Sequence, residues 1–211
     1  MKVETYCGGM VETNGYLITR DGLGWAVDAP EGMRDWLLER RQGAGFRLVG
    51  LLLTHGHWDH IVDARPIQAE FKVPVWIHRD SAPLLRTPSL QSSYNPFCAI
   101  EPCVPERELG DEKRAELGGL EWELRLCPGH CPGSLVFHLP EEKILWGGDV
   151  LFAGGVGRWD IPGGSEEQLF RSITDQLLPL PDDTRVLPGH GEATTIGRER
   201  KSNPYLQRLR R

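Results

Sequence analysis

The segment THGHWDH carries the side chains of this sequence best suited to binding metal ions. It places His55, His57, Asp59 and His60 within six positions, directly after the apolar run LVGLLL at 48–53. On an extended backbone His55 and His57 point the same way, because residues two apart share a face. His60 lies where the chain is expected to turn into a helix, and Asp59 is expected to cap that helix. Such a corner presents ligands in two directions, which suits two adjacent metal ions better than one.

Three further candidate ligands follow other strand-like runs. They are His130 in LCPGHC, Asp149 in WGGDV and His190 in LPGHGE. Each has glycine or proline beside it, as expected where a strand stops and the backbone approaches a crowded centre. Imidazoles and carboxylates are suitable ligands for divalent ions at neutral pH. The sequence therefore predicts a metal site built from strand ends that are far apart in the chain.

The elements that must position these ligands alternate between short apolar runs and helical stretches. Residues 86–108 hold four prolines and predict a long loop that could cover a site. Two strand-rich halves, each followed by helices, favour two sheets packed face to face with helices outside, in one domain over residues 1–211. Predicted strands lie at 15–19, 25–29, 48–53, 73–78, 120–126, 134–139, 143–148 and 185–187, and predicted helices at 30–41, 60–71, 165–178 and 196–211.

Composition narrows the class of protein. The net charge of −6 argues against a large polyanionic partner, so no nucleic acid is expected. No run approaches the roughly 18 apolar residues of a membrane span, and MKVETYCGGM lacks a secretory signal, so we expect a cytoplasmic protein. The five cysteines suggest no disulfide framework. The segment 196–211 holds six basic side chains and one acidic, which fits either a small acidic ligand or a solvated helix.

The pattern THxHxDH with distant His, Asp and His resembles the metallo-β-lactamase superfamily over nearly the whole chain. The resemblance implies an α+β fold, a four-layer αββα sandwich of two mixed β-sheets packed face to face with helices on the outside. It also implies two divalent metal ions, with zinc expected and iron or manganese also suited to the ligands. The implied ligands are His55, His57 and His130 for one ion, Asp59, His60 and His190 for the other, and Asp149 as the bridge.

Two further stretches resemble glyoxalase II (hydroxyacylglutathione hydrolase) and its single-domain relatives, namely 150–173 with the core GRWDIPGG, and 189–204. This resemblance implies a hydrolase in which a hydroxide bridging the metals, at Asp59 and Asp149, attacks a thioester carbonyl. S-lactoylglutathione or a related acylglutathione is the implied substrate. A thiolate with a pKa near 8.5 leaves readily, so no general acid is required.

Four basic residues are candidates for binding the substrate. The chain ends before the helical domain that supplies much of the glutathione site in two-domain glyoxalase II, so we expect other groups to hold the glutathione carboxylates. For Arg158, a structural ion pair with Asp160 is favoured over contact with the substrate. The candidates are Arg158, Arg198, Arg200 and Lys201.

Alternatives within the same superfamily remain open at this point. A persulfide dioxygenase with a single iron shares most of these motifs and would use His55, His130 and Asp149. A lactonase or another esterase would use the same hydroxide on a different carbonyl. β-Lactamases generally carry cysteine or serine in place of the bridging aspartate, so Asp149 argues against antibiotic hydrolysis. The sequence does not predict the oligomeric state or the role of Cys131.

Overall fold

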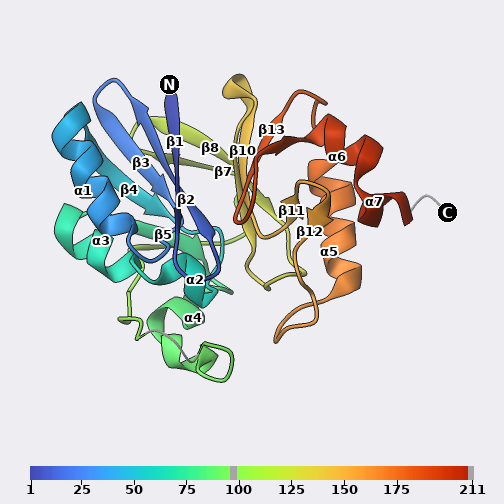
Figure 1. Cartoon of the computed structure of the whole chain (residues 1–211), viewed down its shortest axis with the longest axis horizontal. Coiled ribbons are helices and arrows are strands. Elements are labelled where there is room, and N and C mark those ends of the chain that lie inside the picture. Colours follow the sequence, from blue (N-terminus) through green and yellow to red (C-terminus); the bar gives the residue numbers. More distant parts are fainter. Residues whose placement is uncertain (96–98, 209–211) are drawn as a thin grey trace. The chain divides into compact units, whose positions relative to one another are not determined.

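A computed structural model describes residues 1–95 and 99–208 of the chain. The chain divides into two compact units, coloured in sequence order in Figure 1. The first unit comprises Met1–Gly110 and Leu117–Leu120, and the second comprises Asp111–Glu116 and Glu121–Arg211. Part of the predicted loop 86–108, including Cys98, and the end of the basic segment lie outside the described residues. The single domain over 1–211 stays a prediction.

The first unit contains a six-stranded mixed sheet in the order β1-β2-β3-β4-β5-β6. Its first three strands are antiparallel, whereas β3 through β6 run parallel. Because parallel strands have their carboxyl ends at one edge, the residues after β3 and β4 emerge close together. The strands are β1 (Lys2–Gly8), β2 (Thr13–Arg20), β3 (Leu23–Val27), β4 (Arg47–Leu52), β5 (Val75–His78) and β6 (Arg107–Leu109).

Helices of the first unit follow the apolar pattern of the sequence, with two corrections. The predicted helix 60–71 is two helices, because the chain breaks at Val62 and Asp63, and Pro66 lies in the first turn of the second, where no intrahelical donor is needed. His57, not Asp59, is the N-cap of α2. The elements are α1 (Met33–Ala44), α2 (Trp58–Ile61), α3 (Ala64–Phe71), α4 (Ala82–Arg86) and the 3-10 helix η1 (Pro88–Gln91).

The second unit contains the other six-stranded sheet, in the order β14-β13-β10-β9-β8-β7. Strands β8, β9 and β10 are antiparallel, and β10 and β13 are parallel, so the residues after both emerge at the same edge. The strands are β7 (Arg114–Leu117), β8 (Leu120–Leu126), β9 (Leu135–Leu139), β10 (Ile144–Gly148), β13 (Arg185–Pro188) and β14 (Thr194–Thr195), with a separate hairpin of β11 (Leu151–Phe152) and β12 (Gly155–Val156).

Helices of the second unit pack on the buried residues of that sheet. Leu169 and Ile173 of the predicted helix 165–178 are fully buried with Val186 and Leu145 in one apolar cluster. The elements are the 3-10 helix η2 (Pro140–Glu142), α5 (Glu166–Ser172), the π-helix η3 (Ile173–Leu177), α6 (Ile196–Ser202) and α7 (Pro204–Arg208). Two six-stranded mixed sheets with helices confirm the predicted α+β class. Of the helices within the described ranges, none is long and apolar enough to cross a membrane.

Candidate metal centre

The first unit presents four candidate ligands at the carboxyl end of β4. After Leu52 the chain leaves the sheet, carries His55 and His57 in the loop, and enters α2 with Asp59 and His60. The His55 ring centroid lies 4.6 Å from that of His57 and 4.2 Å from that of His60. The Nε2 atom of His60 lies 3.4 Å from a carboxylate oxygen of Asp59. The predicted corner therefore gathers these side chains within a few ångströms.

Asp28, at the carboxyl end of the neighbouring strand β3, fixes the orientation of these histidines. One of its carboxylate oxygens accepts the Thr54 amide at 2.8 Å, and the other lies 2.9 Å from Nδ1 of His60. A carboxylate can only accept, so the proton of His60 is on Nδ1 and Nε2 keeps the lone pair that a metal needs.

Thr54 extends the same arrangement to His55. Its hydroxyl donates its single proton to Asp28, at 2.8 Å, and lies 3.1 Å from Nδ1 of His55. Because that proton is already used, the hydroxyl accepts from His55 Nδ1–H, which leaves Nε2 of His55 as the ligand atom. Asp59 is oriented separately, since the hydroxyl of Thr13 donates to its Oδ2 at 2.6 Å. All three supporting groups come from strand ends of one sheet.

The second unit presents three candidate ligands, each directly after a strand or turn. Nε2 of His130 lies 3.5 Å, and Nε2 of His190 3.4 Å, from Oδ2 of Asp149. The Nδ1 atom of His130 lies 2.8 Å from the Arg158 carbonyl oxygen, which can only accept. The proton is therefore on Nδ1, and His130 also offers Nε2. An aspartate between two imidazoles is the arrangement expected of a bridging ligand.

Two glycines allow the chain to approach these ligands closely. A side chain at Gly157 would overlap the carbonyl oxygen of Asp149. Gly129 has a φ of 129° and a side chain there would overlap the backbone of Leu169 in α5, so glycine is required directly before His130. Gly129 is one of the glycines predicted beside a candidate ligand, whereas Gly157 lies apart from the ligands in the chain and was not predicted.

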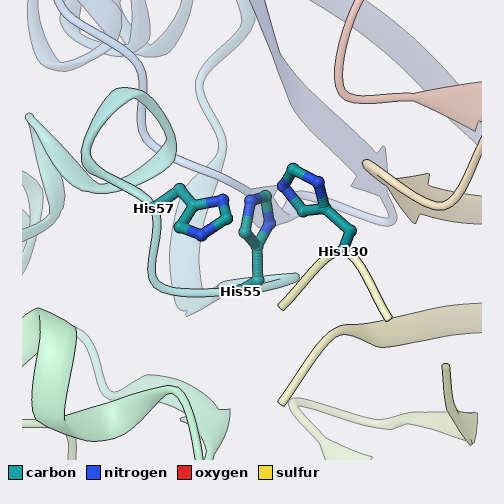
Figure 2. A group of neighbouring side chains, drawn as sticks. All are labelled: His55, His57 and His130. Carbon is teal, nitrogen blue, oxygen red and sulfur yellow. The ribbon is translucent and has the colours of Figure 1, made fainter. Parts of the chain in front are cut away.

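Three groups of side chains are spaced to hold metal ions. Within each group the candidate ligand atoms lie within 4.8 Å of one another, and Figure 2 shows the first group. The groups are His55, His57 and His130; His55, His60 and Asp149; and Asp59, His60 and His190.

The donor chemistry of these groups fits divalent cations. Five imidazoles and two carboxylates form a mixed N/O set, and every side chain except Asp59 and His190 is buried. Asp149 is buried, and a buried carboxylate charge requires a compensating positive charge, which neutral imidazoles do not supply. The buried His/Asp clusters are therefore consistent with a dinuclear metal site.

The predicted substrate-binding residues all have partners within the second unit. Arg158 pairs with Asp160 through two contacts of 3.0 and 3.2 Å, and both side chains are largely exposed. This pair holds the pKa of the Asp160 carboxyl below its usual value. Arg200 pairs with Asp182 and donates to the carbonyl of Leu180. A role of these residues in binding substrate stays a prediction.

Arg198 and Lys201 also contact acidic side chains. Arg198 lies 3.4 Å from Glu192, and Nζ of Lys201 lies 3.8 Å from Asp182. Between them in α6, the buried Glu199 accepts the amide of Gly154 and the Asn203 side-chain amide. The helix carrying the basic residues thus also anchors the hairpin that follows Asp149, a structural role that was not predicted.

The family model described as "Metallo-beta-lactamase superfamily" matches residues 20–190 of the chain. The chain belongs to the metallo-beta-lactamase superfamily. A protein of Haemophilus influenzae named hydroxyacylglutathione hydrolase GloC is 37% identical over 209 residues, covering 98% of each chain. The predicted family and the likeness to hydroxyacylglutathione hydrolases are confirmed.

Solved structures of superfamily proteins match along the same length. The chain is similar to a structure titled BLEG-1 B3 metallo-beta-lactamase, with a TM-score of 0.92 and 32% identity, covering 97% of this chain and 99% of that one. It is also similar to TTHA1623 in a di-iron-bound form, with a TM-score of 0.87 and 34% identity, covering 96% and 100%. The chain therefore has the metallo-β-lactamase fold.

Proposed function

We propose that this protein is a metal-dependent hydrolase that cleaves an acylglutathione thioester, with S-lactoylglutathione as the leading substrate. The observation that carries the proposal is that a complete set of buried His and Asp ligands occurs in a chain similar along its length to a hydroxyacylglutathione hydrolase. Membership in the metallo-beta-lactamase superfamily supports the coarser part of the proposal, metal-dependent hydrolysis.

The seven side chains would hold two divalent ions in the arrangement that the family resemblance implies. His55, His57 and His130 would hold one ion, with Asp149 shared. Zinc is compatible with this mixed donor set, and iron is supported by the di-iron form of a relative at 34% identity. When bound, the ions would supply an activated water near neutral pH and polarise the substrate carbonyl.

The chain's own groups would keep the ligands in the form that binds cations. Asp28 and Thr54 hold the protons of His60 and His55 on Nδ1, and the Arg158 carbonyl does the same for His130. No rotation or proton shift is then needed when cations bind. A glutathione thiolate leaves without protonation, so the site requires no separate acid.

A panel of substrates tests the proposal on one preparation of known metal content. It comprises S-lactoylglutathione, an acyl-homoserine lactone, an aryl ester, a β-lactam and glutathione persulfide with oxygen uptake recorded. We expect the largest kcat/KM for the thioester and two metal ions per chain. A larger kcat/KM for a lactone or ester would refute the substrate assignment, and one iron per chain with rapid oxygen uptake would refute hydrolysis.

β-Lactam hydrolysis is a second candidate, favoured by one observation. The solved structure with a TM-score of 0.92 is named a B3 metallo-beta-lactamase. We rank this activity below thioester hydrolysis because Asp149 occupies the bridging position, where β-lactamases generally carry cysteine or serine. The β-lactam in the panel decides between the two.

A further inference from the structure

Gln91 bonds to the backbone on both sides of a metal-ligand histidine. Its side-chain oxygen accepts the Trp58 amide at 2.8 Å, and its side-chain nitrogen donates to the Gly56 carbonyl at 2.9 Å. Gly56 and Trp58 are the residues immediately before and after His57. One buried side chain therefore satisfies the two peptide groups that set the position of the His57 Cα atom.

The Gln91 side chain is itself held in place. Gln91 is fully buried at the end of η1, and its own carbonyl accepts the amides of Tyr94 and Asn95 at 3.0 and 2.8 Å. An amide group with one donor and one acceptor engaged has a fixed orientation. The position of the 88–95 segment therefore determines where Gln91 holds the metal-ligand loop.

A close contact at Gly56 also restrains the loop that carries His57. A side chain at Gly56 would lie 2.6 Å from the Ser81 carbonyl oxygen and 2.9 Å from Cβ of Leu84. The N-terminal end of α4 therefore packs directly on the backbone of the ligand loop, where only glycine fits. Packing at Gly56 and the two hydrogen bonds of Gln91 restrain the loop from one side.

Resting on the proposed metal function, we infer that Gln91 is a positioning residue for His57. It keeps the histidine in its ligating position before a cation binds, so metal affinity depends on a segment that contributes no ligand. Residues that support metal ligands from outside typically change metal affinity by about 10- to 100-fold when removed. Because Gln91 acts through backbone rather than on the imidazole, we expect the lower end, about 10-fold.

Gln68 provides a matched control in the same unit. It is also a buried glutamine, and its side-chain nitrogen donates to the Val104 carbonyl at 2.8 Å and to Glu106 at 3.0 Å. Neither Val104 nor Glu106 is a candidate metal ligand. Gln68→Met and Gln91→Met each keep the side-chain length and remove hydrogen bonds from a buried amide, so both lower stability for the same physical reason.

The experiment measures metal affinity by chelator competition for the full chain and both variants, at a temperature where circular dichroism shows all three folded. We expect Gln91→Met to bind zinc about 10-fold more weakly than wild type, and Gln68→Met to bind within about twofold. Equal affinities of Gln91→Met and wild type, or equal losses in both variants, would overturn the inference. Wild-type protein without bound metal would overturn the proposed function instead.

A measurement on wild-type protein covers the case in which Gln91→Met does not fold. Hydrogen exchange followed by NMR reports whether the Trp58 amide of the metal-free protein is protected, as its bond to Gln91 requires. Protection comparable to the amides of β4 supports the inference. Exchange at the rate of an unprotected loop amide would overturn it.

Discussion

Replacing Asp28 by asparagine should change the hydrogen bonding that orients His60 and leave the packing around it unchanged. Asparagine has almost the same volume as aspartate, and Asp28 is only 1% exposed, so the packing around it is retained. One oxygen that accepts from His60 or Thr54 becomes an NH2 donor, however. If the NH2 faces His60, the imidazole must move its proton to Nε2, which removes the lone pair that binds metal. If the NH2 faces Thr54 instead, a buried backbone N–H loses its acceptor.

Either orientation weakens metal binding by a similar free energy, because a metal on Nε2 of His60 leaves either His60 Nδ1–H or the Thr54 N–H without an acceptor. A buried donor left without an acceptor costs about 1–3 kcal/mol. At 1.4 kcal/mol for each factor of ten, about 2 kcal/mol corresponds to roughly a 30-fold loss of metal affinity, within the range typical for groups that orient ligands. We therefore expect Asp28→Asn to bind zinc about 10- to 100-fold more weakly than wild type.

The assay is chelator competition on folded protein, with Asp63→Asn as the control. Asp63 accepts the Arg34 amide at 2.8 Å, and burial raises the pKa of its carboxyl, but Arg34 is not a candidate metal ligand. The control should lose stability and keep its metal affinity. Metal affinity of Asp28→Asn within twofold of wild type would show that Asp28 does not set the tautomer of His60.

Three other predictions follow from groups outside the ligand set. Burial raises the pKa of the Cys103 thiol to about 12, so iodoacetamide at pH 8 should label exposed Cys7 and spare Cys103 until the protein unfolds, as peptide mass spectrometry would show. Burial raises the pKa of the Glu123 carboxyl, but hydrogen bonds, chiefly from His138, outweigh burial and lower it overall. The stability that this carboxylate contributes above about pH 4.3 is therefore lost as the pH falls through the folded pKa. Glu123→Gln should therefore flatten the melting temperature below that pH, and an unchanged slope would contradict this. The exposed ion pair of Arg158 contributes little, so Arg158→Gln should leave the melting temperature unchanged, and a raised KM for S-lactoylglutathione would identify substrate contact.

The seven candidate ligands could be predicted because each combines two signals. Each is a metal-capable side chain, and each lies shortly after an apolar run, which for His130, Asp149 and His190 ends in glycine or proline. His130 and Asp149 illustrate the point, since antiparallel pairing through β9 brings the ends of β8 and β10 to one edge of the sheet, and Nε2 of His130 lies 3.5 Å from Oδ2 of Asp149. Residue type and strand ends are both local features, so a single sequence is sufficient to find them.

The supporting residues could not be predicted in the same way. Asp28 is the fourth of the five residues of the predicted strand WAVDA and follows an apolar run as Asp149 does, so a weak signal existed for it. Thr13 and Gln91 had none, because a threonine or glutamine in a strand or proline-rich loop is common and their partners lie 46 and 33 residues away. Their roles depend on tertiary contacts that no local pattern encodes.

Edge elements were missed for a related reason. Strand β1 reads KVETYCG, with exposed and half-buried residues alternating weakly, so its pattern resembles a loop. It is identified only by its antiparallel pairing with β2, from Lys2 opposite Thr19 to Gly8 opposite Thr13. The central strands, by contrast, are buried on both faces and were apparent from their apolar runs.

Anomalous diffraction from crystals of the protein with its native metals would locate the bound ions. We expect two ions, one about 2.0–2.2 Å from Nε2 of His55 and the other at the same distance from Nε2 of His60, with Asp149 in contact with both. A single ion, no ion, or ions bound away from these three residues would contradict it.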